Sequence, residues 1–222
     1  MISEGENTRY DLGIIASWIK PESRVLGLGC GEGELLYFLK TKKQVKETGI
    51  EIKEERVRTC IEKGLSVLQG DINEEILDYP PDYFDYVILS QTLQQVFEPE
   101  SLICSMMKIG KQAIVSFPNF CHWRIRMQLL FSGNVPVTKE LPYEWYNTPN
   151  IRVLSINDFR RFAERLNFRI LKEAAIVLRD MNQNGDIVTT YPNLFASYGI
   201  FMIAKQKLKK NDEDKGMGNE TS

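Results

Sequence analysis

Residues 25–36 read Val25-Leu26-Gly27-Leu28-Gly29-Cys30-Gly31-Glu32-Gly33-Glu34-Leu35-Leu36. The apolar start predicts a short strand, and the apolar residues that follow the glycines at helical spacing predict a helix that begins at once. Glycine lets the backbone turn sharply and approach a ligand, and the first turn of a helix offers N–H groups to it. The stretch therefore predicts a strand, a ligand-binding loop and a helix. A tight turn without a ligand is the alternative.

The spacing of the glycines excludes two phosphate-binding loops. The Walker A pattern is absent from the chain. When each glycine in turn is taken as the first of the dinucleotide fingerprint GxGxxG, the third position falls on Glu32, Glu34 or Leu36. A nicotinamide-dependent oxidoreductase is therefore a poor fit to this chain.

The remaining pattern, GxGxG after an apolar strand, resembles the first motif of class I S-adenosylmethionine (SAM) methyltransferases. In those enzymes the loop wraps the methionine half of SAM, which would place the cofactor at Gly29, Cys30, Gly31 and Gly33. Their pattern has an acidic residue two positions before the first loop glycine. This chain has Gly27 at that position.

Composition and length set the class of protein. The 222 residues are 43% apolar and 26% charged, which is typical of a globular domain. We expect one domain over residues 1–208 and a polar, disordered tail over residues 209–222. A net charge of −2 offers no broad basic surface to nucleic acid or to an anionic membrane, and no run of 18 apolar residues could span one.

The cysteine and histidine content bears on metals and on location. Four cysteines are scattered along the chain, there is no CxxC pair, and there is a single histidine. These counts argue against a zinc site and predict reduced thiols in a cytoplasmic protein.

Predicted strands alternate with predicted helices along most of the chain. This alternation predicts an α/β protein with a doubly wound, mostly parallel sheet. Seven strands are predicted, over residues 25–28, 44–51, 65–68, 84–89, 112–117, 168–178 and 198–204.

Two acidic residues follow predicted strands and are candidate cofactor ligands. Glu51 ends the second strand 18 residues after Gly33, where a carboxylate can accept both ribose hydroxyls of a nucleoside; Ile52 follows it. A solvated surface glutamate is the alternative. Asp71 and Ile72 follow the third strand, where class I methyltransferases place an acid on the adenine amino group and an apolar residue on the ring. The alternative for Asp71 is an N-cap.

The fourth predicted strand runs into Ser90 and Gln91. Ligands of doubly wound sheets bind at the carboxyl ends of the strands, so both residues are candidate contacts to SAM or to a substrate. A glutamine can donate hydrogen bonds but is a poor general base.

Residues 119–154 form an unusual segment after the fifth strand. A predicted helix over 120–131 is followed by an aperiodic stretch that is rich in aromatic residues and proline. Loops of this length in a compact domain are usually functional, so we expect a lid or a docking surface. Its aromatic residues are typical interface anchors, or else a small satellite core. His122 is a candidate acid–base catalyst, and a structural histidine is the alternative.

Sequence strings outside the general methyltransferase motifs add a more specific resemblance. From about Arg9 to Lys205 the chain resembles the MetW family of methionine-biosynthesis proteins. It shares the strings Ser90-Gln91-Thr92-Leu93-Gln94, Ser116-Phe117-Pro118-Asn119-Phe120, His122-Trp123-Arg124, Pro136-Val137-Thr138-Lys139, Leu141-Pro142-Tyr143, Trp145-Tyr146-Asn147-Thr148-Pro149-Asn150 and Asn193-Leu194-Phe195-Ala196. It departs from the family at Gly27, where Asp is usual, and at Cys121, where Gly is usual.

The resemblance implies a class I methyltransferase fold of seven strands, in which the last strand is antiparallel and the last pair inverts the strand order at one edge. It implies SAM, or its product S-adenosylhomocysteine, as the ligand. It also implies a role beside a MetX-type homoserine O-acyltransferase, for which residues 119–154 are the expected docking segment. The alternative is an active SAM-dependent methyltransferase that acts on a small molecule.

Overall fold

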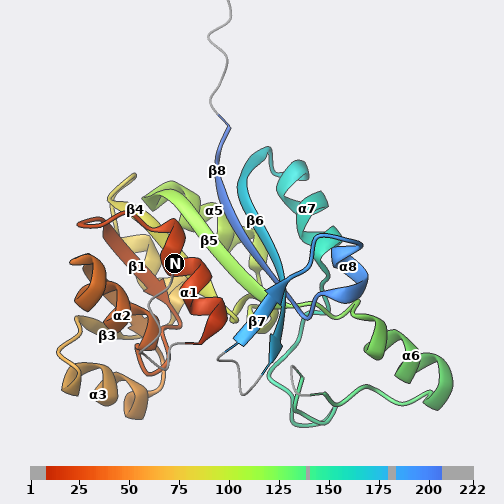
Figure 1. The fold of residues 1–222 in the computed structure, drawn as a ribbon. Helices are drawn as coiled ribbons and strands as arrows, with labels where there is room; N and C mark the ends of the chain where they lie inside the picture. Colours follow the sequence, from red (N-terminus) through yellow and green to blue (C-terminus); the bar gives the residue numbers. More distant parts are fainter. Residues whose placement is uncertain (1–8, 139–140, 180–183, 207–222) are drawn as a thin grey trace, which may run out of the picture.

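The computed structural model describes residues 9–138, 141–179 and 184–206 (Figure 1). The predicted tail therefore lies outside the described residues. The strands are β1 (Arg24–Leu28), β2 (Lys46–Glu51), β3 (Val67–Gln69), β4 (Phe84–Ser90), β5 (Gly110–Pro118), β6 (Phe168–Arg179), β7 (Asn184–Ile187) and β8 (Tyr198–Lys205). The α-helices are α1 (Tyr10–Trp18), α2 (Glu34–Lys43), α3 (Glu54–Glu62), α4 (Ile72–Glu75), α5 (Pro99–Ile109), α6 (Trp123–Ser132), α7 (Ile156–Arg165) and α8 (Pro192–Phe195).

The described strands form one sheet in the order β3-β2-β1-β4-β5-β8-β6-β7. β1 pairs in parallel with both β2 and β4, and β4 pairs in parallel with β5. The chain thus runs outward from β1 to β3 and then returns to the other side of β1. This reversal between β1 and β4 is the switch point at which doubly wound sheets bind ligands. The predicted doubly wound architecture is confirmed.

The far half of the sheet is antiparallel. β8 lies between β5 and β6 and is antiparallel to both, so the expected inversion of the last pair is confirmed. The prediction of seven strands is one short. β6 has twelve residues, and its last four pair with the short strand β7, although the sequence Asn182-Gln183-Asn184-Gly185-Asp186 predicts a turn. The Asn-Gly-Asp sequence of β7 favours a turn, so its strand conformation depends on the pairing with β6.

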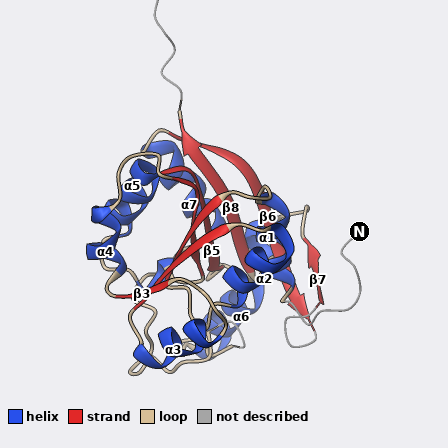
Figure 2. Ribbon diagram, turned by 90° about the vertical axis from the view of Figure 1, so that its left-hand side faces the viewer, coloured by secondary structure: helices blue, strands red, loops and turns tan. Residues whose placement is uncertain are grey.

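Helices cover both faces of the sheet. Figure 2 shows α5 and α7 on one face, and α1 and α2 on the other. Each face has its own core of buried side chains, because the strands in the centre of the sheet are apolar on both sides. None of the helices within the described ranges is long and apolar enough to cross a membrane.

Candidate functional site

The glycine loop joins β1 to α2 at the switch point. Gly29, Gly31 and Gly33 have φ values of 59°, 59° and 74°, in the left-handed region that residues with a Cβ rarely adopt. A Cβ on Gly33 would lie 2.4 Å from Leu65 and 2.8 Å from the Cys60 sulfur, whereas a Cβ on Gly31 would meet no atom within 4 Å. The protein thus leaves the space above Gly31 open, which fits the close approach of a ligand to this backbone.

Glu51, at the end of β2, holds the loop in place. Its side chain is 4% exposed, and its Oε2 accepts a hydrogen bond of 2.8 Å from the Gly31 amide. Its Oε1 accepts a hydrogen bond from the Lys53 amide at 3.1 Å. Each carboxylate oxygen can accept a second bond, so the group retains capacity for ligand hydroxyls. The sequence predicts a ligand carboxylate here, and the geometry adds a role in bracing the loop.

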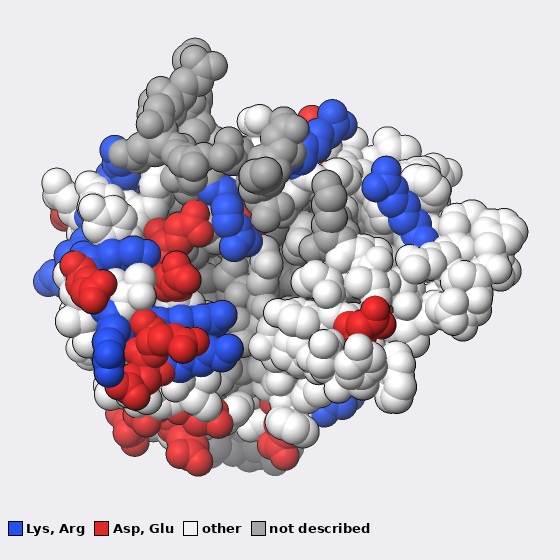
Figure 3. All heavy atoms as spheres, turned by 90° about the horizontal axis from the view of Figure 1, so that it is seen from below, with Lys and Arg blue, Asp and Glu red and all other residues white. Residues whose placement is uncertain are grey.

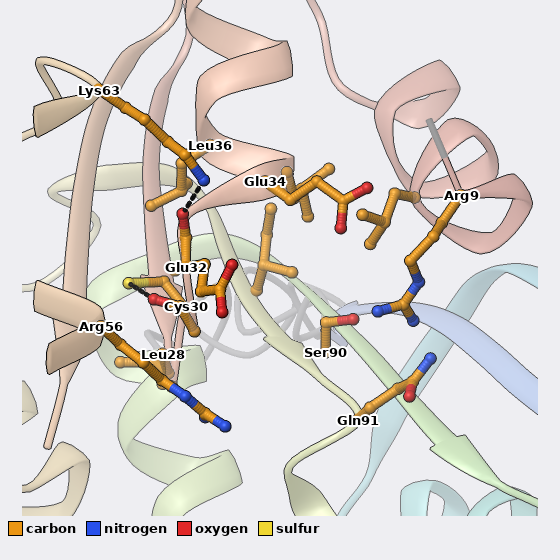
Figure 4. Close-up of a pocket in the computed structure, with 16 residues that line it drawn as sticks. Arg9, Leu28, Cys30, Glu32, Glu34, Leu36, Arg56, Lys63, Ser90 and Gln91 are labelled. Atoms are coloured by element: carbon orange, nitrogen blue, oxygen red, sulfur yellow. Dashed lines mark hydrogen bonds between the residues drawn. The ribbon is translucent and has the colours of Figure 1, made fainter. Parts of the chain in front are cut away.

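A cavity of about 510 Å³ opens over this loop (Figure 4). The loop forms one part of its wall, the carboxyl ends of β1 and β4 form another, and the start of α1 closes one side. Its lining residues are Arg9, Leu12, Gly27, Leu28, Gly29, Cys30, Gly31, Glu32, Glu34, Leu35, Leu36, Arg56, Lys63, Ile88, Ser90 and Gln91.

The structure brings together five of the residues predicted to bind the cofactor. Gly29, Cys30, Gly31, Ser90 and Gln91 all line the cavity.

The other predicted cofactor residues are not among those that line the cavity. Gly33 and Glu51 support the loop from behind. Ile52 is 63% exposed, and Ile72 packs against the core under α5. Asp71 caps α4, because its Oδ1 accepts a hydrogen bond of 2.8 Å from the Asn73 amide. The adenine assignments of Asp71 and Ile72 remain predictions.

The start of α1 contributes charged residues that the sequence reasoning missed. Asp11 is 1% exposed and accepts hydrogen bonds from Arg9 Nε at 3.2 Å and from Arg9 Nη2 at 2.7 Å. It also accepts a bond of 2.7 Å from Gln91 Nε2. A signal was present in the sequence, because Asp11 lies four residues before Ile15 and therefore on the apolar face of this helix.

Two thiols lie under the loop. Cys60 of α3 is buried and its sulfur donates to the Gly31 carbonyl at 3.2 Å. Burial raises the pKa of the Cys60 thiol and raises the pKa of the Cys30 thiol far above its ordinary value. Both groups are therefore protonated at neutral pH and are packing residues, not nucleophiles.

His122, the candidate acid–base residue, lies apart from this cavity. It caps α6, where its Nδ1 accepts a hydrogen bond of 3.4 Å from the Arg124 amide. It lines a second cavity of about 450 Å³, which shares no lining residue with the first. Among the described residues, no group of three or more acidic, histidine or cysteine side chains is arranged to hold a metal ion.

The described part of residues 119–154 protrudes at the carboxyl ends of the parallel strands, the edge of the sheet that carries the cavity (Figure 1). Its start is fixed by buried Asn119, whose Nδ2 donates to the carbonyls of Ala196 at 2.8 Å and Asn193 at 3.1 Å. Helix α6 follows, and the described residues after Gly133 have no regular structure up to Ser155. Its apolar side chains are largely exposed, including Leu130, Phe131, Trp145, Tyr146 and Val153, each by 69–80%. These five side chains therefore do not form a satellite core.

Figure 3 views the carboxyl-end edge of the parallel strands. Charged side chains gather on one side of a hollow in this face. The opposite side, which carries α6 and the segment after it, is mostly uncharged. One face of the molecule thus combines a polar cavity with an exposed aromatic surface.

Comparisons with known proteins identify the family of this chain. A sequence model of the family described as methionine biosynthesis protein MetW matches residues 9–203. The bifunctional methionine biosynthesis protein MetXA/MetW of Rhodopirellula baltica is 32% identical over 194 residues, which cover 83% of this chain and 31% of that protein. The chain thus spans about a third of the length of this relative.

Solved structures show the same fold. A SAM-dependent methyltransferase from Archaeoglobus fulgidus has a TM-score of 0.65 at 19% identity, with 88% of this chain and 91% of that chain covered. The cyclase SpnF has a TM-score of 0.61 at 18% identity, with 87% and 80% covered. The names of these two proteins indicate that one fold hosts different chemistries. This chain has the fold of SAM-dependent methyltransferases, and its sequence shows that it belongs to the MetW family of methionine biosynthesis proteins.

Proposed function

We propose that this protein binds SAM or S-adenosylhomocysteine in the loop cavity and acts as an accessory subunit of homoserine O-acyltransferase. The observation that carries the proposal is the pairing of two features on one face. A cavity over the glycine loop, which the buried Glu51 carboxylate braces, lies beside a large, exposed aromatic surface. The first suits a nucleoside with a polar tail, and the second suits a protein partner.

Several features in and around the cavity support a SAM-like ligand. The open space above Gly31 lets the ligand approach the loop backbone. Glu51 has lone pairs left for the ribose hydroxyls after it has accepted two amide hydrogen bonds. Asp71 and Ile72 are assigned to the adenine, and Ser90 and Gln91 to the methionine end.

The partner is inferred from the relative and from the exposed surface. The relative from Rhodopirellula baltica carries the names MetXA and MetW in one chain, and this chain covers only part of it. We assign the MetX-type acyltransferase to the remainder and place its contact on residues 119–154. Exposed Trp and Tyr side chains are frequent anchors of such contacts. The free cysteines of the described residues fit a reducing, cytoplasmic location for both proteins.

Methyl transfer to a small acceptor is the second candidate, favoured by the position of Ser90 and Gln91 at the carboxyl end of β4. Methyl transfer is an in-line displacement, so positioning supplies much of the rate. The described wall of the cavity contains no histidine, and its Glu32 and Glu34 carboxylates lie on the exposed loop and at the start of α2. The accessory role fits this lining better.

Calorimetric titration tests the ligand. We expect SAM and S-adenosylhomocysteine to bind with micromolar dissociation constants, and Glu51→Ala to abolish binding because it removes both the ribose acceptor and the brace on Gly31. Glu55→Ala, an exposed residue of α3, is the control and should bind normally. Failure of the wild type to bind either ligand at millimolar concentration would contradict the proposed cofactor.

Co-purification tests the partner. A tagged copy of this protein should retain homoserine O-acyltransferase from the same organism, and Trp145→Ala with Tyr146→Ala should lose it. Both side chains are exposed, so the double variant should match the wild type in thermal stability. Tyr37→Ala, which removes an exposed aromatic residue from α2, is the matched control. Equal retention by the double variant would exclude this docking surface.

A further inference from the structure

Arg9, Asp11 and Gln91 form a connected charged unit at one side of the cavity. Asp11 accepts two hydrogen bonds from the Arg9 guanidinium and one from the Gln91 side chain, all between 2.7 and 3.2 Å. The unit joins α1 to the residue that follows β4, and these two positions are 80 residues apart in the sequence. It thus fixes one wall of the cavity to another.

Asp11 is the buried member of this unit. The Asp11 carboxylate is 1% exposed, and a buried carboxylate requires charged or hydrogen-bonding partners. Gln91 is held in turn by its backbone amide, which donates to the Ser116 carbonyl at 2.8 Å. The two hydrogen bonds to the buried Asp11 carboxylate restrain the guanidinium of the partly exposed Arg9 side chain before a ligand arrives.

The orientation directs the guanidinium into the cavity. Figure 4 shows it reaching from α1 toward Ser90 and Gln91. A guanidinium has five N–H groups in a planar fork, and two of them are directed to Asp11. The remaining three leave a second edge for an anion, and a planar carboxylate is the anion that matches a fork best.

The end of β1 carries no acidic residue that could offset the charge of Arg9. Gly27 lies at the floor of the cavity, where methyltransferases of this class carry an acid. A Cβ on Gly27 would lie 3.2 Å from both methyl carbons of Leu36, so the packing under the loop does not leave room for one without movement. The only carboxylates that line the described cavity come from Glu32 and Glu34. The α1 side therefore presents a positive group to the ligand.

We propose that Arg9 binds the carboxylate of an α-amino acid carried by the ligand, and that Asp11 and Gln91 are positioning residues for it. The cavity then selects nucleosides that end in an amino acid over those that lack the carboxylate. The inference rests on the proposed function for the nucleoside part of the ligand. The inference adds that the cavity recognises the amino-acid end of the ligand and that Arg9 is the side chain that recognises it.

The test compares SAM with decarboxylated SAM, which differs only in the absence of the carboxylate. By calorimetry, the wild type should bind SAM about 10- to 100-fold more tightly, the range for a charge-assisted hydrogen-bonded pair. Arg9→Ala should bring the two dissociation constants within about 3-fold of each other, mainly by weakening SAM. Arg9→Lys keeps the charge without the fork and should restore part of the preference.

Two further variants separate positioning from a general loss of charge. Asp11→Asn removes the ion pair that orients the guanidinium and should reduce the preference for SAM while Arg9 is still present. Arg56→Ala removes another cationic residue of the cavity, on the α3 side (Figure 4), and should keep the ratio of the two dissociation constants. Thermal melts of each variant identify any that do not fold, and Arg9→Lys then carries the comparison.

The possible results are distinguishable. An Arg9→Ala protein that is folded and still prefers SAM by the wild-type ratio would overturn the carboxylate assignment and leave the proposed cofactor intact. If Arg56→Ala lost the preference for SAM as fully as Arg9→Ala does, the assignment would also be overturned, because the preference would then depend on positive charge in general and not on Arg9. A wild type that binds neither nucleoside would overturn the proposed cofactor, and this assignment with it.

Discussion

At the scale of single residues, two glycines of one loop serve different purposes. Gly31 and Gly33 both have positive φ, so each accepts a conformation that is strained for other residues. Only Gly33 is also confined by neighbours, since Leu65 and Cys60 occupy the space where a side chain would begin. Gly33 therefore serves packing of the loop against α3, whereas Gly31 serves the open cavity.

Alanine substitutions should separate these roles. Gly33→Ala combines backbone strain with overpacking and should lower the free energy of unfolding by about 2–5 kcal/mol. Gly31→Ala carries only the strain, about 1–2 kcal/mol, but should weaken SAM binding because its methyl group enters the cavity. Urea unfolding and calorimetry measure the two quantities. Equal destabilisation by both substitutions would show that the contacts of Gly33 are unimportant.

Local patterns predicted the residues whose role follows from their place after a strand. Gly29, Gly31, Ser90 and Gln91 line the cavity, as expected from strand ends that meet at one edge, whereas Gly33 does not. The unit of Arg9, Asp11 and Gln91 escaped because Gln91 lies 80 residues from Asp11, and no spacing rule connects a helix start to the end of β4. Side-chain pairs between residues so far apart in the sequence can be recognised only once the fold is known.

At the scale of elements, one carboxylate joins three neighbouring strands where they begin. Asp85 of β4 accepts hydrogen bonds from the Arg24 amide of β1 at 2.8 Å and from Lys111 Nζ of β5 at 2.6 Å. Burial by itself raises the pKa of Asp85. The hydrogen bonds and positive charges of Lys111 and Arg24 outweigh this effect, so the net pKa lies below its ordinary value of 3.8.

The stability contributed by Asp85 should therefore depend on pH. A lowered pKa in the folded state means that the contribution is complete above about pH 4 and is lost as the pH falls through the folded-state pKa. Asp85→Asn should lower the free energy of unfolding by about 1 kcal/mol at pH 7, and by less at about pH 3.

Urea unfolding at several pH values measures this difference. Asp82→Asn, which disrupts the more exposed ion pair with Lys205, is the control and should change stability by less than about 0.5 kcal/mol. A gap between wild type and Asp85→Asn that widens at low pH would contradict the assignment.

The elements that escaped prediction are those without their own hydrophobic pattern. β7 carries turn residues and exists because the end of β6 is available for pairing. β3 was expected over residues 65–68 but covers Val67–Gln69. Its bounds are set by pairing with Gly49–Glu51 of β2, and the residues before it connect the end of α3 to the sheet. The described residues of the aperiodic stretch after α6 form neither helix nor strand, as the sequence predicts, since its aromatic residues follow neither period.

At the scale of the whole molecule, the sheet joins a parallel half that carries the loop cavity to an antiparallel half. β1 to β5 are parallel, and the ends of β1 and β4 line the cavity, whereas β8, β6 and β7 are antiparallel and contribute no residue to it. β8 is buried along seven of its eight residues and hydrogen bonds to a strand on each side. It should therefore be among the most stable parts of the protein.

Hydrogen exchange followed by mass spectrometry tests this order of stability. Amides of β8 should exchange only through global unfolding, while those of β7, exposed at the sheet edge, should exchange faster by several orders of magnitude. Peptides of β5 provide the internal reference for slow exchange. Exchange of β8 at the rate of β7 would mean that the two halves of the sheet open separately.

The position of β8 also has a consequence for synthesis on the ribosome. Within the described sheet, β6 pairs only with β8 and β7, so it has no attachment to the first five strands until residues 198–205 have been made. Until then β5 presents an open edge, which is a template for pairing with other chains. The nascent chain can thus form its glycine loop early but completes its sheet last. Its need for chaperones should be greatest just before β8 leaves the ribosome.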